Sequence, residues 1–431
     1  MISQSEKEQI VSLIKKEVVP AIGCTEPVAV SLCVARATEV LGKQPEKIKV
    51  YLSANVLKNA MGVGIPGTGM VGLPIAVALG ALTGKSEYGL QVLKDVRPED
   101  VERGKRYISE KRLDIALKKG ITDSLYIEVH CIAGEDEAEV IIRGAHTNFS
   151  YMAKNGETLY NEARKENGDG NGDAGKDEIP LSFAKVYEFA TTVPLDDIRF
   201  ILQAAELNRA AAKLSNEGNY GHNVAKTVTG TLGKKIFGDS LFSHMMSYTA
   251  AACDARMDGA MIPVMSNSGS GNQGITATLP VLSYAEDTNC PEDKLIRALT
   301  LSHLTVVCIK QKLGRLSALC GCVAAATGAS CGITYLMGGN YRQATFAVKN
   351  MAGNITGMIC DGAKPSCALK ISSGVSTAVL SAIMAMEHKV VSSLEGIVDD
   401  DVDKTIENLT SIGAIGMRET DELVLKIMTS K

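Results

Sequence analysis

The sequence predicts an α+β protein in which a large all-helical domain carries a smaller α/β domain inserted near the N-terminus. Three observations support this prediction. Helical periodicity occupies both ends of the chain, at 5–42 and from Leu181 onward. A strand pattern at Lys47–Leu52 and a hairpin pattern at 125–143 lie between them. The chain has 431 residues, of which 45% are hydrophobic, which is enough for two or three domains with their own cores.

The N-terminal segment, residues 1–45, is expected to form helices that pack on the C-terminal domain. In 5–18, apolar residues recur at helical spacing between charged ones, and the pattern stops before Pro20. A second helix is predicted at 28–42, where Gly42 closes it.

Residues 46–160 are expected to form the small α/β domain. Apolar and polar residues alternate along Lys47–Leu52 as in a strand. Leu125–Ala133 and Ala138–Arg143 read as two further strands, joined by a short acidic turn. The charged stretch near 98–119 is predicted to be helical.

A polar loop or linker is expected at 161–180, and residues 181–431 are expected to form the helical domain. The linker is rich in Gly, Asp and Asn. Asp169–Asp173 resembles the start of a calcium loop, but the glycine and glutamate required further along are missing. From Leu181 to the end, Gly clusters interrupt helical periodicity and no convincing run of strands occurs.

The composition argues against nucleic-acid and membrane partners. The formal net charge is −4 and no long basic run is present to neutralise phosphates. The stretches 59–84 and 316–341 are uncharged and long enough to cross a bilayer. The first, however, contains helix-breaking Gly and Pro residues, the second consists mainly of small residues, and the chain has no Trp for an interfacial belt. Close-packed helices inside the protein explain both stretches.

We expect a cytoplasmic protein that forms a symmetric homodimer. The N-terminal residues lack the apolar core of a secretory signal. In a reducing compartment the eleven cysteines are expected to be buried thiols, metal ligands or catalysts instead of disulfides. Large Gly- and Ala-rich helical faces predict buried contacts between subunits.

Two short segments indicate chemistry. Cys24, followed by Thr25 and Glu26, is expected at a helix start, where backbone amides and the helix dipole lower the pKa of a thiol; a buried structural cysteine is the equal alternative. The segment Ser266–Gly274 combines hydroxyl and amide side chains with glycines and predicts a backbone nest for a carboxylate or phosphate, with a surface loop as the alternative. The residues assigned to this binding loop are Ser266, Asn267, Ser268, Gly269, Ser270 and Asn272.

The late cysteines, Cys320, Cys322, Cys331, Cys360 and Cys367, lack the paired C-x-x-C spacing of a zinc site. A cluster held by three thiolates needs no regular spacing. Such a cluster leaves one iron without a protein ligand, free to act as a Lewis acid.

The chain resembles the L-cysteine desulfidase family, relatives of the alpha chain of the iron–sulfur L-serine dehydratases. The resemblance covers essentially the whole chain, and four segments carry it: Ala21–Pro27, Ser266–Gly274, Leu319–Cys322 and Cys360–Cys367.

The resemblance implies a 4Fe–4S cluster held by Cys320, Cys360 and Cys367, which have the family's spacing of forty and seven residues. Cys322 fits the pattern less well and is treated as a neighbour. The resemblance casts Cys24 as the general base or as an auxiliary thiol.

The implied reaction is the α,β-elimination of L-cysteine to pyruvate, ammonia and sulfide, with a small L-amino acid as the partner molecule. We assign the substrate carboxylate to the 266–274 loop and, by charge complementarity, the substrate ammonium to Glu26. L-serine dehydration by the same mechanism is the alternative activity. A cluster-bearing redox sensor or a small-molecule binding protein is the alternative outside enzymes.

Overall fold

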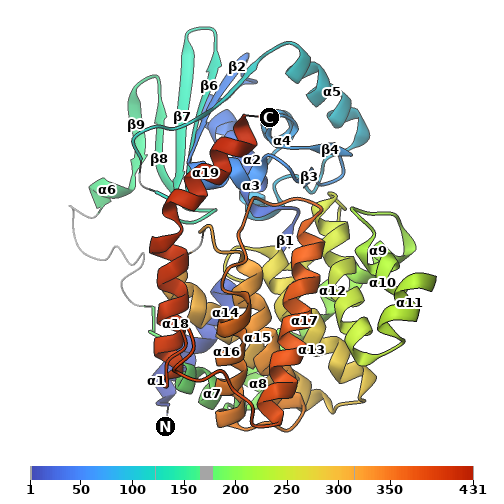
Figure 1. Cartoon of the computed structure of the whole chain (residues 1–431). Coiled ribbons are helices and arrows are strands. Elements are labelled where there is room, and N and C mark those ends of the chain that lie inside the picture. Colours follow the sequence, from blue (N-terminus) through green and yellow to red (C-terminus); the bar gives the residue numbers. More distant parts are fainter. Residues whose placement is uncertain (1, 122, 166–177, 315, 431) are drawn as a thin grey trace.

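A computed structural model of the protein describes residues 2–121, 123–165, 178–314 and 316–430 (Figure 1). A mixed sheet with its helices lies above a bundle of long helices, and α18 and α19 run along one side from the bundle to the sheet. The predicted α+β class is confirmed. The calcium-like segment Asp169–Asp173 of the predicted linker lies outside the described residues.

The elements up to residue 165 are α1 (Gln4–Glu17), β1 (Pro20–Ile22), α2 (Thr25–Leu41), β2 (Lys47–Leu52), α3 (Ala54–Ala60), β3 (Gly64–Ile65), β4 (Met70–Val71), α4 (Leu73–Leu82), the 3₁₀ helix η1 (Ser86–Gln91), α5 (Pro98–Ser109), β5 (Leu113–Leu117), β6 (Tyr126–Ala133), β7 (Asp136–Arg143), β8 (Phe149–Lys154), β9 (Glu157–Asn161) and α6 (Glu162–Lys165). The later elements are α7 (Phe183–Thr192), α8 (Leu195–Ile198), η2 (Arg199–Ile201), α9 (Leu202–Glu217), α10 (Val224–Thr229), α11 (Thr231–Phe237), α12 (Leu241–Met257), β10 (Pro263–Met265), α13 (Gly271–Asp287), α14 (Glu292–Leu313), α15 (Gly321–Leu336), α16 (Tyr341–Ile355), α17 (Cys367–Met386), α18 (Val402–Ser411), the π-helical turn η3 (Ile412–Gly416) and α19 (Arg418–Thr429).

The main sheet has the strand order β5-β2-β6-β7-β8-β9. β2 pairs in parallel with β5, and the other neighbours are antiparallel. The predicted strand at 47–52 and the predicted hairpin are confirmed as β2 and as β6–β7. Along β2, buried side chains alternate with more exposed ones, as expected for a strand with one buried face.

Three strands of the main sheet were not predicted from the sequence, and neither were the short strands β1, β3, β4 and β10 outside it. The stretch predicted as helix near 98–119 divides into α5 and the strand β5, and the sheet continues beyond the hairpin into β8 and β9. β5 and β9 are the edge strands, and their side chains are partly or largely exposed. Edge strands need no continuous apolar face, so their sequences give little alternation to read.

The buried side chains form two hydrophobic clusters. One lies between the main sheet, α2 and α4, and the other fills the helical bundle. The segment 1–45 contributes to both: α1 packs in the bundle, where β1 also pairs with β10, whereas the apolar side chains of α2 belong to the sheet cluster. The short stretch at 18–24 therefore passes from one core to the other.

Close approach of helices explains the uncharged stretch at 316–341. A side-chain carbon at Gly328 of α15 would lie 2.4 Å from the carbonyl oxygen of Ser302 in α14, so the two backbones can meet only because residue 328 is glycine. Among the described residues, one helix, α17, is long and apolar enough to cross a membrane, but half of its apolar window is buried inside the protein. A core helix of this kind passes the same test, so α17 is weak evidence for a membrane segment.

Candidate active site

A cavity of about 100 Å³ lies where the two hydrophobic clusters meet. It is lined by the first residues of several helices: α2 contributes Cys24 and Glu26, α13 contributes Ser270 and Asn272, and α15 contributes Cys320. Helix N-termini carry unpaired amides and the positive end of the helix dipole. The cavity is therefore suited to anions, whether thiolates or a carboxylate.

Cys24 and Glu26 form a buried, hydrogen-bonded pair. The Cys24 thiol donates to Glu26 Oε2 over 3.0 Å. Thr25 Oγ1 lies 3.0 Å from the same carboxylate oxygen and 2.7 Å from the Gly269 carbonyl oxygen, which ties α2 to the binding loop. Asn59 Nδ2 is 3.4 Å from Glu26 Oε1. The protein thus holds the carboxylate in one orientation beside the thiol.

The structure corrects the expected electrostatics of Cys24. Cys24 is the N-cap residue of α2, as the sequence predicted, but it follows the strand β1 instead of a helix. Burial, followed by the negative charge of Glu26, raises the pKa of the thiol well above its usual value, and Arg256 opposes this rise. The expected lowering by the helix start is outweighed, because desolvation and a nearby like charge both disfavour the thiolate.

Glu26 remains ionised although it is buried. Burial favours the protonated carboxyl group, but attraction from His146 and the hydrogen bond from Cys24 outweigh burial, and the pKa of Glu26 falls to about 2. His146 Nε2 lies 3.9 Å from Glu26 Oε1, which is too far for a hydrogen bond. The carboxylate is therefore a charged hydrogen-bond acceptor in contact with the Cys24 thiol.

Cys320, Cys360 and Cys367 all line the same cavity. Cys320 is the N-cap residue of α15, and Cys367 is the first residue of α17. Backbone hydrogen bonds join the Cys360 segment to the segment before α15. The Cys360 N–H donates to the Ala318 carbonyl oxygen over 2.7 Å, and the Cys320 N–H donates to the Met358 carbonyl oxygen over 2.9 Å. Residues forty apart in sequence thereby reach the same wall.

The electrostatics of these thiols favour a cation between them. Burial, followed by the charge of Cys360, raises the pKa of Cys320 to about 12, and burial also raises that of Cys367. Neighbouring buried thiols disfavour one another's ionised form. A metal ion bound between them supplies positive charge, and the thiols then lose their protons readily.

The spacing of the three sulfur atoms argues against a single metal ion. Within the described ranges, the three cysteines do not form a group whose ligand atoms all lie within 4.8 Å of one another. Zinc–sulfur bonds of about 2.3 Å in a tetrahedral site require closer sulfurs. In a cubane cluster each thiolate binds a different iron, so wider spacing fits. The residues present therefore fit a polynuclear iron–sulfur cluster.

Cys322 packs beside this group. Its thiol donates to the carbonyl oxygen of Lys370 over 3.4 Å, and a side-chain carbon at Gly374 would lie 2.3 Å from its sulfur. Cys322 thus also lines the cavity, and a contact with α17 occupies its side chain.

The predicted binding loop divides into two parts. Ser270 and Asn272 line the cavity, whereas Ser266, Asn267, Ser268 and Gly269 lie behind its wall. Ser266 Oγ donates to the Val19 carbonyl oxygen over 2.6 Å. Asn267 Nδ2 is 3.0 Å from the His303 carbonyl oxygen. These residues fix the loop, and the start of α13 faces the cavity.

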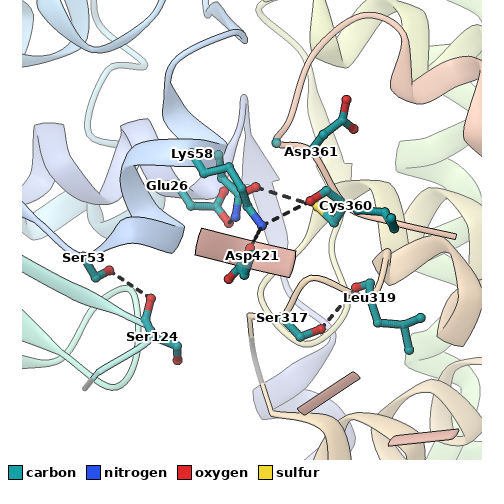
Figure 2. Close-up of polar contacts among 12 residues, drawn as sticks. Glu26, Ser53, Lys58, Ser124, Ser317, Leu319, Cys360, Asp361 and Asp421 are labelled. Carbon is teal, nitrogen blue, oxygen red and sulfur yellow. Dashed lines mark hydrogen bonds and ion pairs between the residues drawn. The ribbon is translucent and has the colours of Figure 1, made fainter. Parts of the chain in front are cut away.

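Sequence reasoning missed several residues of the site. Arg256 at the end of α12 lines the cavity and is only 2% exposed. Asn59 contacts Glu26 and lies 3.9 Å from Cys360. Lys58, which is 1% exposed, donates to the Cys360 carbonyl oxygen over 3.2 Å and forms an ion pair with Asp421 of α19 (Figure 2). Each lies in an apolar or unremarkable stretch of sequence, so no local motif marks it.

Comparison with known proteins shows the family to which the chain belongs. The family model described as serine dehydratase alpha chain matches residues 87–426. A UPF0597 protein of Bacteroides fragilis is 65% identical over 430 residues, covering 100% of this chain and 99% of the relative. UPF0597 proteins of Parabacteroides distasonis and Oleidesulfovibrio alaskensis are 65% and 45% identical, and each alignment covers at least 98% of both chains. The names of these relatives state no substrate.

Proposed function

The chain belongs to the serine dehydratase alpha chain family, and from that premise we propose that it is an iron–sulfur lyase that eliminates the β-substituent of a small L-amino acid, with L-cysteine as substrate. One observation carries this proposal: three thiols suited to a cluster line the same small cavity as the hydrogen-bonded pair Cys24–Glu26. A metal site and a proton-transfer pair that meet in one cavity are the two components that such an elimination requires.

Cys320, Cys360 and Cys367 would hold a 4Fe–4S cluster. When bound, it supplies a Lewis acid for the leaving group, because three thiolates leave one of four irons without a protein ligand. The positions of α15 and α17 support this assignment, since both helices direct their N-terminal ends toward the cavity.

The residues of this chain bind the substrate and move the proton. The start of α13 faces the cavity with its unpaired amides and offers a place for the substrate carboxylate. Cys24 rests as a thiol because burial and Glu26 raise its pKa. An ammonium group entering the cavity favours the thiolate, since a nearby positive charge lowers a thiol's pKa.

Cys24, ionised in this way, takes the Cα proton, and the thiol proton that it gave up leaves with the departing sulfide as hydrogen sulfide, so the thiol is regenerated. Glu26 has a pKa of about 2, so it keeps its negative charge and is available to hold the substrate ammonium. Loss of hydrogen sulfide from cysteine leaves aminoacrylate, which tautomerises to the imine, and water converts the imine to pyruvate and ammonia.

The family name favours L-serine as the second candidate substrate. Serine would follow the same path with loss of water in place of hydrogen sulfide. The decisive experiment is anaerobic purification, analysis of iron and acid-labile sulfide, and a pyruvate assay with each amino acid. We expect about four irons per chain and faster turnover of cysteine. Faster turnover of serine would reassign the substrate, and an iron-containing protein inactive on both would favour a sensor or binding role.

A further inference from the structure

Arg256 is a buried cation whose interactions within the protein are incomplete. Its Nη1 donates to Asn272 Oδ1 over 2.9 Å, but its Nε has no hydrogen-bond partner. In the part of the chain that the structure describes, no carboxylate forms an ion pair with its guanidinium. A charge removed from water without a counter-charge is strongly destabilising. An anion that enters the cavity would remove this cost.

The surrounding backbone is shaped to admit the guanidinium. A side-chain carbon at Gly271 would lie only 2.3 Å from Arg256 Nε, so glycine at this position lets the guanidinium lie against the first turn of α13. That turn has unpaired amides, and its N-cap residue, Ser270, makes no side-chain capping hydrogen bond. The guanidinium and the helix start therefore present hydrogen-bond donors and positive charge at one place.

A buried acceptor lies in the same cavity. Gln273 is 3% exposed, and its Oε1 has no hydrogen-bond partner, while its Nε2 is 3.4 Å from the Asn267 carbonyl oxygen. An unpaired cation together with an unpaired neutral acceptor matches a ligand that has one carboxylate and one ammonium group. A phosphate or a dicarboxylate would leave Gln273 Oε1 without a donor.

We propose that Arg256 is the receptor for the α-carboxylate of a small α-amino acid and that Gln273 Oε1 accepts a hydrogen bond from its ammonium group. The choice of an amino acid as the ligand rests on the proposed function, whereas the unpaired atoms of Arg256 and Gln273 are observed in the structure. Arg256 binds the substrate directly, and the 266–274 loop, assigned to the carboxylate from the sequence, supplies the helix start beside it.

The test uses the full chain, purified anaerobically, and calorimetric titration with L-alanine, which has no β leaving group and cannot be turned over. L-Alaninamide, which lacks the carboxylate, is the matched ligand. We expect L-alanine to bind and L-alaninamide to bind at least about 10-fold more weakly. Equal affinity for the two ligands, or no binding of L-alanine, would overturn the proposal without any variant being needed.

Three variants complete the test. Arg256→Gln should weaken L-alanine binding roughly 100-fold, and Arg256→Lys about 10-fold, because lysine keeps the charge but loses the planar, two-pronged hydrogen bonding. Arg297→Gln is the control. Arg297 does not line the cavity, and its Nη1 donates to the carbonyl oxygens of Ala190 and Val193, so this variant should bind L-alanine as the parent does. A folded Arg256→Lys or Arg256→Gln protein with parental affinity would refute the assignment.

The failure of this inference is distinguishable from the failure of the proposed function. If the protein binds L-alanine through Arg256 but forms no pyruvate from cysteine or serine, the carboxylate site stands and the lyase activity is refuted. Conversely, if Arg256→Gln turns over cysteine with an unchanged KM, the lyase stands and Arg256 is not the carboxylate receptor.

Discussion

The reactivity of Cys24 depends on opposing influences on one thiol. The start of α2 and the nearby Arg256 favour the thiolate, whereas burial and the ionised Glu26 favour the thiol. The second pair prevails in the protein without substrate. A resting thiol is protected from adventitious oxidation, because the thiolate is the reactive form. Activation then follows the arrival of positive charge with the substrate.

The first prediction concerns the pKa of Cys24. Glu26→Gln removes the negative charge 3.0 Å from the sulfur, so the pKa of the thiol should fall from its raised value and thiolate should form at lower pH. The measurement is a pH titration of thiolate absorbance in iron-free protein, taken as the difference between Glu26→Gln and Glu26→Gln/Cys24→Ser. A titration midpoint equal to that of the parent, measured against Cys24→Ser, would show that Glu26 does not control this thiol.

The second prediction separates a proton-transfer role for Cys24 from a ligand role. Cys24→Ser should keep iron, acid-labile sulfide and the substrate-induced change in the visible spectrum, but turnover should fall by at least roughly 10²-fold, as is typical when a positioned base is lost. Iron loss instead would make Cys24 a cluster ligand. Unchanged turnover with full iron would make it a packing residue.

The third prediction tests the cluster ligands. Cys360→Ala should abolish the iron chromophore while leaving the far-ultraviolet circular dichroism unchanged, because Cys360 lies in a connecting loop and not inside a helix. Cys290→Ser is the control: Cys290 contacts Thr288 and does not line the cavity, so this variant should keep its iron. Full iron in Cys360→Ala would disprove the ligand assignment.

At the scale of elements, the site is built from helix starts that the chain brings together. Those of α2, α13, α15 and α17 all reach the cavity. Sequence patterns located most of these segments, because a Cys or Ser next to a Gly cluster and an apolar helical run is a local signal. The patterns also located β2 and the β6–β7 hairpin. Buried and more exposed residues alternate along β2 and β7, whereas β6 is mostly buried.

The site residues, the pKa direction and the strands that the sequence did not predict all depend on contacts between residues distant in sequence. Arg256 and Lys58 are functional candidates only because their charges are buried at the cavity or beside it, and burial is not visible in a local pattern. The same holds for the pKa of Cys24, which reverses its expected direction once the carboxylate and the surrounding protein are in place. The edge strands β5 and β9 were missed because tertiary pairing, and not intrinsic alternation, makes them strands.

The C-terminal helix α19 is joined to the cluster loop through Lys58. The Lys58 ammonium contacts both the Cys360 carbonyl oxygen and the Asp421 carboxylate (Figure 2). Its side chain is 1% exposed and that of Asp421 is 15% exposed, so the ion pair is largely removed from water. Breaking a buried pair is costly because it leaves a charge without its partner.

The fourth prediction follows from this pair. Asp421→Asn should lower the free energy of unfolding by about 3–5 kcal/mol, as for other buried pairs with one partner removed, and should speed iron loss to a chelator because the Cys360 loop loses a tie. The control is Glu407→Gln, which breaks the exposed Lys404–Glu407 pair and should cost at most about 0.5 kcal/mol. Urea denaturation measures the free energy of unfolding of both variants. Equal effects of the two substitutions would show that the Lys58–Asp421 pair is not buried as described.

At the scale of the whole molecule, the site depends on both hydrophobic cores. α2 packs with the sheet and presents Cys24 and Glu26, while α13, α15 and α17 pack in the bundle and present the loop and the other thiols. The pairing of β1 with β10, where Ala21 lies opposite Val264, fixes the two parts beside the cavity. A change in how the cores pack would therefore separate the proton-transfer pair from the cluster ligands.

The outer face of α17 carries exposed apolar side chains together with serines, Ser373 and Ser376 among them. Leu369, Leu380 and Ile383 lie on one side of the helix and are 53%, 52% and 42% exposed. The opposite side of α17 packs against α12, α15 and α16. We propose that a second copy of this chain covers the exposed face in a symmetric dimer, as the small-residue helical faces in the sequence predict.

The fifth prediction tests this dimer. Light scattering at micromolar concentration should give twice the mass of one chain, and Leu380→Glu should reduce it to the monomer mass, because a carboxylate would be buried at the centre of a self-complementary contact. Leu159→Glu is the matched control: Leu159 is 56% exposed on the edge strand β9, away from α17, so the dimer should persist. A monomer mass for the parent protein would refute the dimer. A dimer that survives Leu380→Glu would place the interface on another face, and protein that sediments only with membranes would instead assign the face to lipid.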